Sequence, residues 1–98
     1  MRRAVELWEI ERAKLERYLK LALERATFEW DEEGRFWFSE IPGFPGVWGQ
    51  APSQEECRKI LAEVLTDWLS HKLRDGDDDI PTIEGIDLLA ESRRAPSG

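Results

Sequence analysis

Three glycines spaced three residues apart, Gly43, Gly46 and Gly49, are the first candidates for chemistry, because glycine-rich loops can cradle phosphates. A Walker-type loop also needs a lysine that reaches the phosphates, and a dinucleotide loop opens directly into a helix. Residues 36–57 contain no lysine or arginine, and the two prolines of this stretch lack a backbone N–H. We therefore expect a rigid turn between strands and no cofactor site.

The chain has one histidine, His71, and one cysteine, Cys57. Both fall in the same predicted helix, where a separation of 14 residues corresponds to about 21 Å of helical rise. They cannot share a zinc or nucleophilic site within one subunit, and a single cysteine excludes an intramolecular disulfide. We expect a surface or boundary position for His71 and a core position for Cys57.

The acidic residues do not form a recognisable metal or catalytic pattern. A calcium loop starting at Asp75 would need glycine at its sixth position and glutamate at its twelfth, but these are Ile80 and Ile86. Glu32, Glu33 and Glu40 lie near a predicted hairpin, where nothing pairs them with a nucleophile or a base. We predict no metal site and no enzymatic activity.

Charge and composition limit the class of partner. The net charge of −7 and pI of about 4.7 disfavour direct nucleic-acid binding, because an acidic surface repels phosphates. The same charge suits a basic protein partner, and it also serves solubility alone. The 98 residues allow one domain with a thin core, so we expect a homo-oligomer, a dimer or tetramer. No segment is apolar enough to span a membrane, and early acidic residues argue against a secretory signal, so we expect a cytoplasmic protein.

The elements that position these residues follow from periodicity. Residues 2–25 favour a helix, and residues 53–74 favour a second one with a Ser53–Glu56 capping box and Gly76 as a left-handed cap. Strands are expected at 26–31, 35–41, 47–50 and 82–87, with Gly34 taking a positive φ in the first turn. These patterns predict an α+β fold with the order α-β-β-β-α-β, in which the second helix packs on one face of an antiparallel sheet.

The second predicted strand is apolar on both sides. Phe36, Phe38 and Glu40 alternate with Trp37, Ser39 and Ile41. One helix covers only one face of a sheet, so the first helix or a second subunit is expected to cover the other.

The middle of the chain resembles the HicB antitoxin family. The resemblance rests on the acidic turn Asp31-Glu32-Glu33-Gly34, the aromatic strand, the run Ile41-Pro42-Gly43-Phe44-Pro45-Gly46, and Ser53 followed by Glu55-Glu56-Cys57. It covers about residues 26–86 and implies a β-β-β-α-β fold similar to a truncated ribonuclease H fold without its catalytic carboxylates. It also implies an antitoxin that blocks HicA, a small basic toxin that cleaves mRNA, and a tendency to form oligomers.

The chain departs from the family pattern in three places. Ala51-Pro52 replaces the usual Gly-Asp, Cys57 replaces alanine, and only about a dozen residues follow Ile86. We therefore expect a short form without a C-terminal DNA-binding domain. The expected domain organisation is a helical extension (1–25), a HicB-like domain (26–88) and a frayed tail (89–98).

The resulting hypothesis is a non-enzymatic HicB-like protein-binding module that neutralises a HicA-type toxin. The alternatives are a stand-alone oligomeric structural or regulatory module without a toxin, and, less favoured, a small-molecule binder or enzyme. The residues expected at a partner or subunit interface are Trp37, Phe44, Trp48, Glu32, Glu33 and Glu40. For each aromatic residue, an ordinary core position is the competing interpretation.

Overall fold

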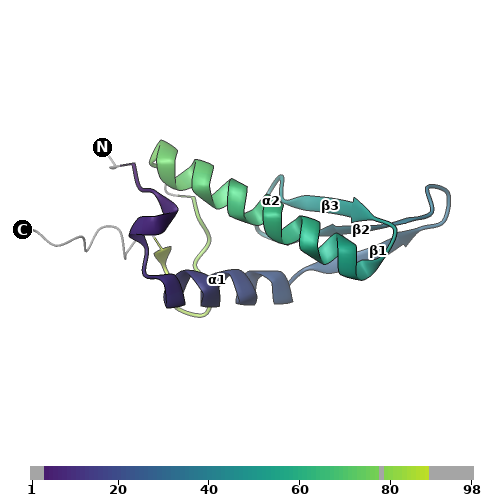
Figure 1. Ribbon diagram of the computed structural model, residues 1–98, viewed down its shortest axis with the longest axis horizontal. Helices are drawn as coiled ribbons and strands as arrows, with labels where there is room; N and C mark the ends of the chain where they lie inside the picture. The colour runs from purple at the N-terminus through teal and green to yellow at the C-terminus, as the bar shows by residue number, and fades with distance from the viewer. Residues whose placement is uncertain (1–3, 78, 89–98) are drawn as a thin grey trace, which may run out of the picture.

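A computed structural model gives the protein an α+β fold, in which a three-stranded antiparallel sheet packs against a long helix (Figure 1). The structure describes residues 4–77 and 79–88. In chain order, the elements are the 3₁₀ helix η1 (Leu7–Glu9), α1 (Arg12–Glu24), β1 (Thr27–Asp31), β2 (Phe36–Glu40), β3 (Trp48–Ala51) and α2 (Gln54–Asp75). The predicted α+β class is confirmed, whereas the predicted tail at 89–98 lies outside the described residues.

The two sides of the sheet differ because side chains alternate along each strand. In the central strand, Ser39 pairs with Phe28 of β1 and with Gly49 of β3, and α2 covers this side, where Arg58 lies 5.6 Å from the centre of the Phe28 ring. The opposite side, called the open face below, carries Thr27, Glu29, Asp31, Phe36, Phe38, Glu40, Trp48 and Gln50.

Helix α2 holds the molecule together because its two halves contact different partners. Ser53 caps its start by accepting a hydrogen bond from the Glu56 N–H at 3.1 Å, and Gly76 ends it with φ 75°, as predicted. One row of side chains at i, i+4 spacing is buried and consists of Cys57, Leu61, Leu65, Leu69 and Leu73. The first half of α2 packs on the sheet, and the second half packs against α1 and η1 (Figure 1).

Helix α1 does not cover the open face. It lies beside the second half of α2, beyond the end of the sheet (Figure 1). The sequence predicted that either the first helix or a second subunit covers this face. The first helix does not, and no other element of the described residues covers it.

The prediction of one continuous helix over residues 2–25 is wrong. The chain forms the short η1, becomes extended at Ile10 (φ −88°, ψ 139°) and only then enters α1. The break places both Val5 and Ile10 in the core, and the Val5 N–H donates to the Leu73 carbonyl at 2.8 Å. A straight helix has a single apolar stripe and could not bring both side chains to the end of α2. Residues 2–25 are rich in helix-forming residues and contain no glycine or proline, so the sequence alone did not predict the break at Ile10.

The predicted fourth strand at 82–87 is also wrong. Ile83 and Ile86 bridge to each other through two backbone hydrogen bonds of 3.2 and 2.8 Å. Glu84 and Gly85 between them both have positive φ, 48° and 82°, as in a type I′ turn. Because these backbone groups bond within the turn, the segment does not extend the sheet, and its two isoleucines pack into the main core instead.

Tyr18 connects this turn to α1 and gives a prediction for stability at alkaline pH. Its side chain is fully buried, its hydroxyl donates to the Pro81 carbonyl, and its ring packs edge-on against Phe44 with centroids 6.3 Å apart. Burial, followed by the negative charge of Asp87, raises the pKa of Tyr18 well above its usual value, while Arg25 opposes the shift. The unfolded chain releases the proton near pH 10, whereas the folded protein retains it.

We therefore expect full stability from this group below about pH 10 and a one-proton loss of stability as the pH rises from there towards the folded pKa. Because Tyr18 is the only tyrosine, tyrosinate absorbance reports it alone. It should appear near about pH 10 in urea-unfolded protein and only at higher pH in folded protein. Tyr18→Phe is the control and should lose this slope. A folded protein that ionises near about pH 10 would contradict the prediction.

Candidate protein interface on the open face of the sheet

Aromatic side chains form the centre of the open face. Phe38 of β2 stacks on Trp48 of β3, with ring centroids 5.9 Å apart and ring planes at 28°. Trp48 is 50% exposed, and Phe36 and Phe38 are half-buried. A cluster of large aromatic side chains left open to solvent is typical of a protein interaction surface.

The charged strand residues of the open face are all acidic. Glu29 and Glu40 are exposed, Asp31 is half-buried, and the strand residues of the open face include no lysine or arginine. Within the described part of the chain, neither the Glu29 nor the Glu40 side chain has an ion-pair or hydrogen-bond partner. The open face therefore presents unpaired carboxylates beside exposed aromatic rings.

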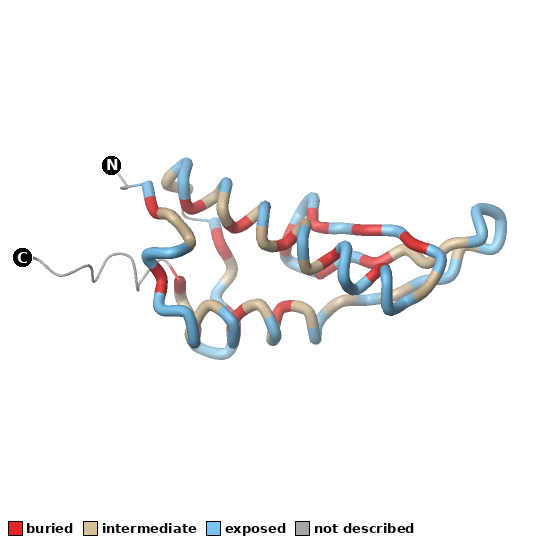
Figure 2. Tube along the Cα trace, in the orientation of Figure 1, coloured by how far each residue is buried: buried red, intermediate tan, exposed pale blue. Residues whose placement is uncertain are grey.

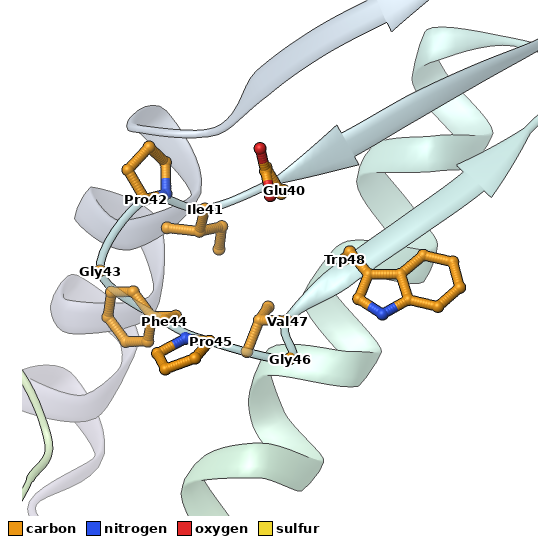
Figure 3. Close-up of a pocket in the computed structure, with 9 residues that line it drawn as sticks. All are labelled: Glu40, Ile41, Pro42, Gly43, Phe44, Pro45, Gly46, Val47 and Trp48. Atoms are coloured by element: carbon orange, nitrogen blue, oxygen red, sulfur yellow. The ribbon is translucent and has the colours of Figure 1, made fainter. Parts of the chain in front are cut away.

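The segment between β2 and β3 is a pair of consecutive turns. The Phe44 N–H donates to the Ile41 carbonyl at 3.1 Å, and the Val47 N–H donates to the Phe44 carbonyl at 3.0 Å. Each turn has proline second and glycine third, and Gly43 and Gly46 have φ of 91° and 90°, as type II turns require. The three residues at the turn ends, Ile41, Phe44 and Val47, are buried and anchor the loop (Figure 3).

A hollow of about 380 Å³ lies along this loop. Glu40 and Trp48, which face each other across β2 and β3, flank it, and the loop residues line the rest (Figure 3). We call it the loop hollow. Its walls are rigid because proline restricts φ and each turn is closed by a hydrogen bond.

The β1–β2 hairpin forms the exposed tip at the other end of the sheet (Figure 2). The Asp31 carboxylate accepts hydrogen bonds from the Glu33 and Gly34 N–H groups at 3.0 and 3.1 Å. Arg35, with φ 59°, takes the left-handed position that was expected at Gly34. Glycine is needed at 34 for space instead, because a Cβ there would lie 2.2 Å from the Phe36 ring.

A second hollow, of about 340 Å³, lies beside this tip and is lined by Glu29, Trp30, Asp31, Glu32 and Phe38. We call it the hairpin hollow. The Glu32 carboxylate accepts a hydrogen bond from the Trp30 indole N–H at 3.4 Å, although the Trp30 ring packs against Trp37 on the helix side.

The other candidate residues for chemistry do not lie on the open face. Cys57 is buried, its thiol donates to the Gly49 carbonyl at 3.4 Å, and burial raises its pKa, which disfavours the reactive thiolate. His71 is exposed on α2. Asp77 and Asp79 form ion pairs with Lys72 at 3.6 and 2.9 Å. Within residues 4–77 and 79–88, no group of three acidic, histidine or cysteine side chains is arranged to hold a metal, and no helix has the length and apolar character of a membrane span.

Comparison with known proteins identifies the family. The sequence model of the UPF0150-like family matches residues 17–81, which is most of the chain. This protein belongs to the UPF0150-like family. Among solved structures, the crystal structure of TTHA0281 from Thermus thermophilus is similar, with 37% identity and a TM-score of 0.63 over 68% of this chain and 83% of that one. No protein with a curated description matches significantly.

The UPF0150-like region contains all six residues predicted at an interface, but the structure separates them. Trp48 and Glu40 lie on the open face as a cross-strand pair. Glu32 and Glu33 are exposed in the hairpin turn, and Trp37 lies on the helix side, with its ring 5.5 Å from that of Trp30.

The predicted partner contact of Phe44 is wrong. Its ring is only 3% exposed and packs against Tyr18 and against Trp68, whose centroid lies 5.3 Å away. The two flanking turns direct Phe44 into the core, so it supports the loop of this UPF0150-like domain from inside.

Sequence reasoning also missed members of the open face. Alternation puts Phe36 and Phe38 on one side of the second strand, but only the sheet register joins them to Trp48 and Glu29. The alternation of side chains in the first two predicted strands could have found them. Once the length of the hairpin turn is known, it pairs Glu29 with Phe38.

Proposed function

We propose that this UPF0150-like protein is a non-enzymatic, HicB-like antitoxin module that binds and neutralises a small basic toxin of the HicA type, which cleaves mRNA. The supporting observation is the open face, because it combines exposed aromatic rings with unpaired carboxylates and has no cation on its strands. Aromatic anchors supply binding energy, and a surface of one charge sign selects a partner of the opposite sign.

Charge also argues that the open face receives a different protein rather than a second copy. Two copies placed face to face would bring Glu29, Asp31 and Glu40 of each chain together, and like charges at an interface oppose association. A basic toxin would neutralise the same carboxylates.

The proposal predicts that a small basic protein is encoded beside this one, and it is tested by expressing that protein with and without the present chain. We expect that it arrests growth when expressed alone, that co-expression restores growth, and that the two proteins purify together. Trp48→Ala should weaken the complex by at least about 30-fold, because a central exposed indole is a typical hot spot. Ile60→Ala, on the helix side of the sheet and away from the open face, is the matched control and should leave affinity unchanged. No arrest and no complex would refute the toxin-binding role.

A second function, a stand-alone oligomeric module, is favoured by the other end of the molecule. Trp8 is 81% exposed beside a hollow of about 370 Å³ that is lined by Leu7, Trp8, Ile10, Arg12 and Leu15. The lining of this hollow includes no acidic residue and lies before the family match, which begins at residue 17. Light scattering separates the two functions: a stable homo-oligomer that Trp8→Ala converts to monomer, with no binding to the basic neighbour, would favour this alternative.

A further inference from the structure

The open face has acidic groups at two places, one on each side of its aromatic centre. The loop hollow carries the Glu40 carboxylate beside Trp48, and the hairpin hollow carries those of Glu29 and Asp31. Phe38 pairs with Glu29 across β1 and β2 and stacks on Trp48, so the Phe38–Trp48 pair separates the two hollows.

The register of the sheet sets the distance between these acidic places. Glu40 lies at one end of β2, and Asp31 pairs with Phe36 at the other end, four residues away. At about 3.4 Å per residue the separation is about 14 Å, with Phe38 at its midpoint. Along the face the order is therefore Glu40, Phe38 and Asp31, while Glu29 lies beside Phe38 on β1 and lines the same hollow as Asp31.

We infer that the open face binds a protein segment that presents two basic side chains about 14 Å apart with an apolar side chain between them, one basic group in each hollow. This inference rests on the proposed function and specifies the partner's chemistry. In an extended segment, residues i, i+2 and i+4 point to the same side and span this distance, so the pattern is basic-x-apolar-x-basic.

Arginine suits both hollows better than lysine. A planar guanidinium can stack on an aromatic ring while it donates hydrogen bonds to a carboxylate. The loop hollow offers Glu40 with the indole of Trp48, and the hairpin hollow offers Glu29 and Asp31 with the ring of Phe38. Trp48 lines the loop hollow and is half exposed, whereas Phe38 lines the hairpin hollow only.

Among the described residues, no lysine or arginine lines the loop hollow. Within the described residues the Glu40 side chain has no ion-pair partner, and β1, β2 and β3 contain no lysine or arginine. The consecutive type II turns also hold the loop in one conformation before binding, which lowers the entropy lost on association.

The test uses the full chain and the peptide acetyl-Arg-Ser-Leu-Ser-Arg-amide as the probe, with indole N–H signals followed by NMR. We expect the Trp48 signal, assigned with Trp48→Phe, to shift saturably, with a Kd on the order of 1 mM or tighter. Two control peptides should bind at least about fivefold more weakly: one with citrulline, a neutral isostere, at both arginine positions, and the permuted acetyl-Arg-Arg-Ser-Leu-Ser-amide. Equal binding of either control would overturn the inference.

Single substitutions test which carboxylates of the open face bind the two arginines of the peptide. Glu40→Gln and Glu29→Gln should each weaken peptide binding at least about fivefold, whereas Glu33→Gln, an exposed turn residue that lines neither hollow, should not. An equal effect of Glu33→Gln would indicate general charge attraction and contradict the inference. If the basic toxin binds but Glu40→Gln and Glu29→Gln do not affect it, the inference fails and the proposed function stands. If the peptide binds as expected and no toxin does, the proposed function fails and the inference stands.

Discussion

Phe44→Ala is expected to lower the free energy of unfolding by about 3–5 kcal/mol, which corresponds to a loss of roughly 12 °C or more in melting temperature. The ring is buried at the junction of α1, α2 and the loop, where it packs edge-on against both Tyr18 and Trp68. Its removal leaves a cavity bordered by two turns whose conformations restrict collapse. Thermal and urea unfolding followed by circular dichroism measure the effect.

Trp48→Ala is the matched control for that experiment. Both residues are aromatic and lie four positions apart in the same stretch, but Trp48 is 50% exposed. We expect a loss of no more than about 1 kcal/mol for Trp48→Ala, because half of its surface remains in water in the folded chain. Equal destabilisation by the two substitutions would contradict the assignment of Phe44 to the core and Trp48 to the open face.

Leu61→Ala is expected to cost about 2–5 kcal/mol of stability, and Ile60→Ala no more than about 1 kcal/mol. The two residues are adjacent on α2 and similar in size. Leu61 is fully buried between the helix and the sheet, whereas Ile60 is 36% exposed and lies at the edge, over Gly49. The comparison measures the rotation of α2 about its own axis.

Urea unfolding of both variants at one pH checks the prediction, with the dependence on urea concentration required to stay constant so that the free energies are comparable. If Ile60→Ala costs as much as Leu61→Ala, the helix is rotated relative to the arrangement described above. If both cost little, the first half of α2 does not bury its apolar row on the sheet.

The sequence predicts helix α2 but not which of its sides faces the sheet. The pattern in residues 53–74 indicates an amphipathic helix, and its caps at Ser53 and Gly76 are predictable from local chemistry alone. Apolar residues at both i+3 and i+4 spacing allow two neighbouring rows to face the core. The sheet selects the row through Leu61, which is fully buried, and the Cys57 thiol of this row donates to the carbonyls of Trp37 and Gly49.

The sequence likewise predicted some residues of the candidate site but not the direction of every side chain. Exposed carboxylates and aromatic residues near the hairpin and the loop pointed to a binding surface, and Trp48 and Glu40 lie on the open face. Phe44 carries the same kind of side chain as the members of that face. Its direction depends on two positive φ values, at Gly43 and Gly46, whose combined effect on the side chain between them is not visible in the sequence.

The sequence by itself determined the class of fold, the first three strands, the second helix with both caps and the rigid corner, because local backbone preferences and apolar periodicity act over a few residues. The tertiary structure decided where residues distant in the chain meet. It broke the first helix to bury Val5 and Ile10, turned residues 83–86 back on themselves, and left one side of the sheet open within the described part of the chain. These outcomes depend on long-range packing against α2, which no local pattern encodes.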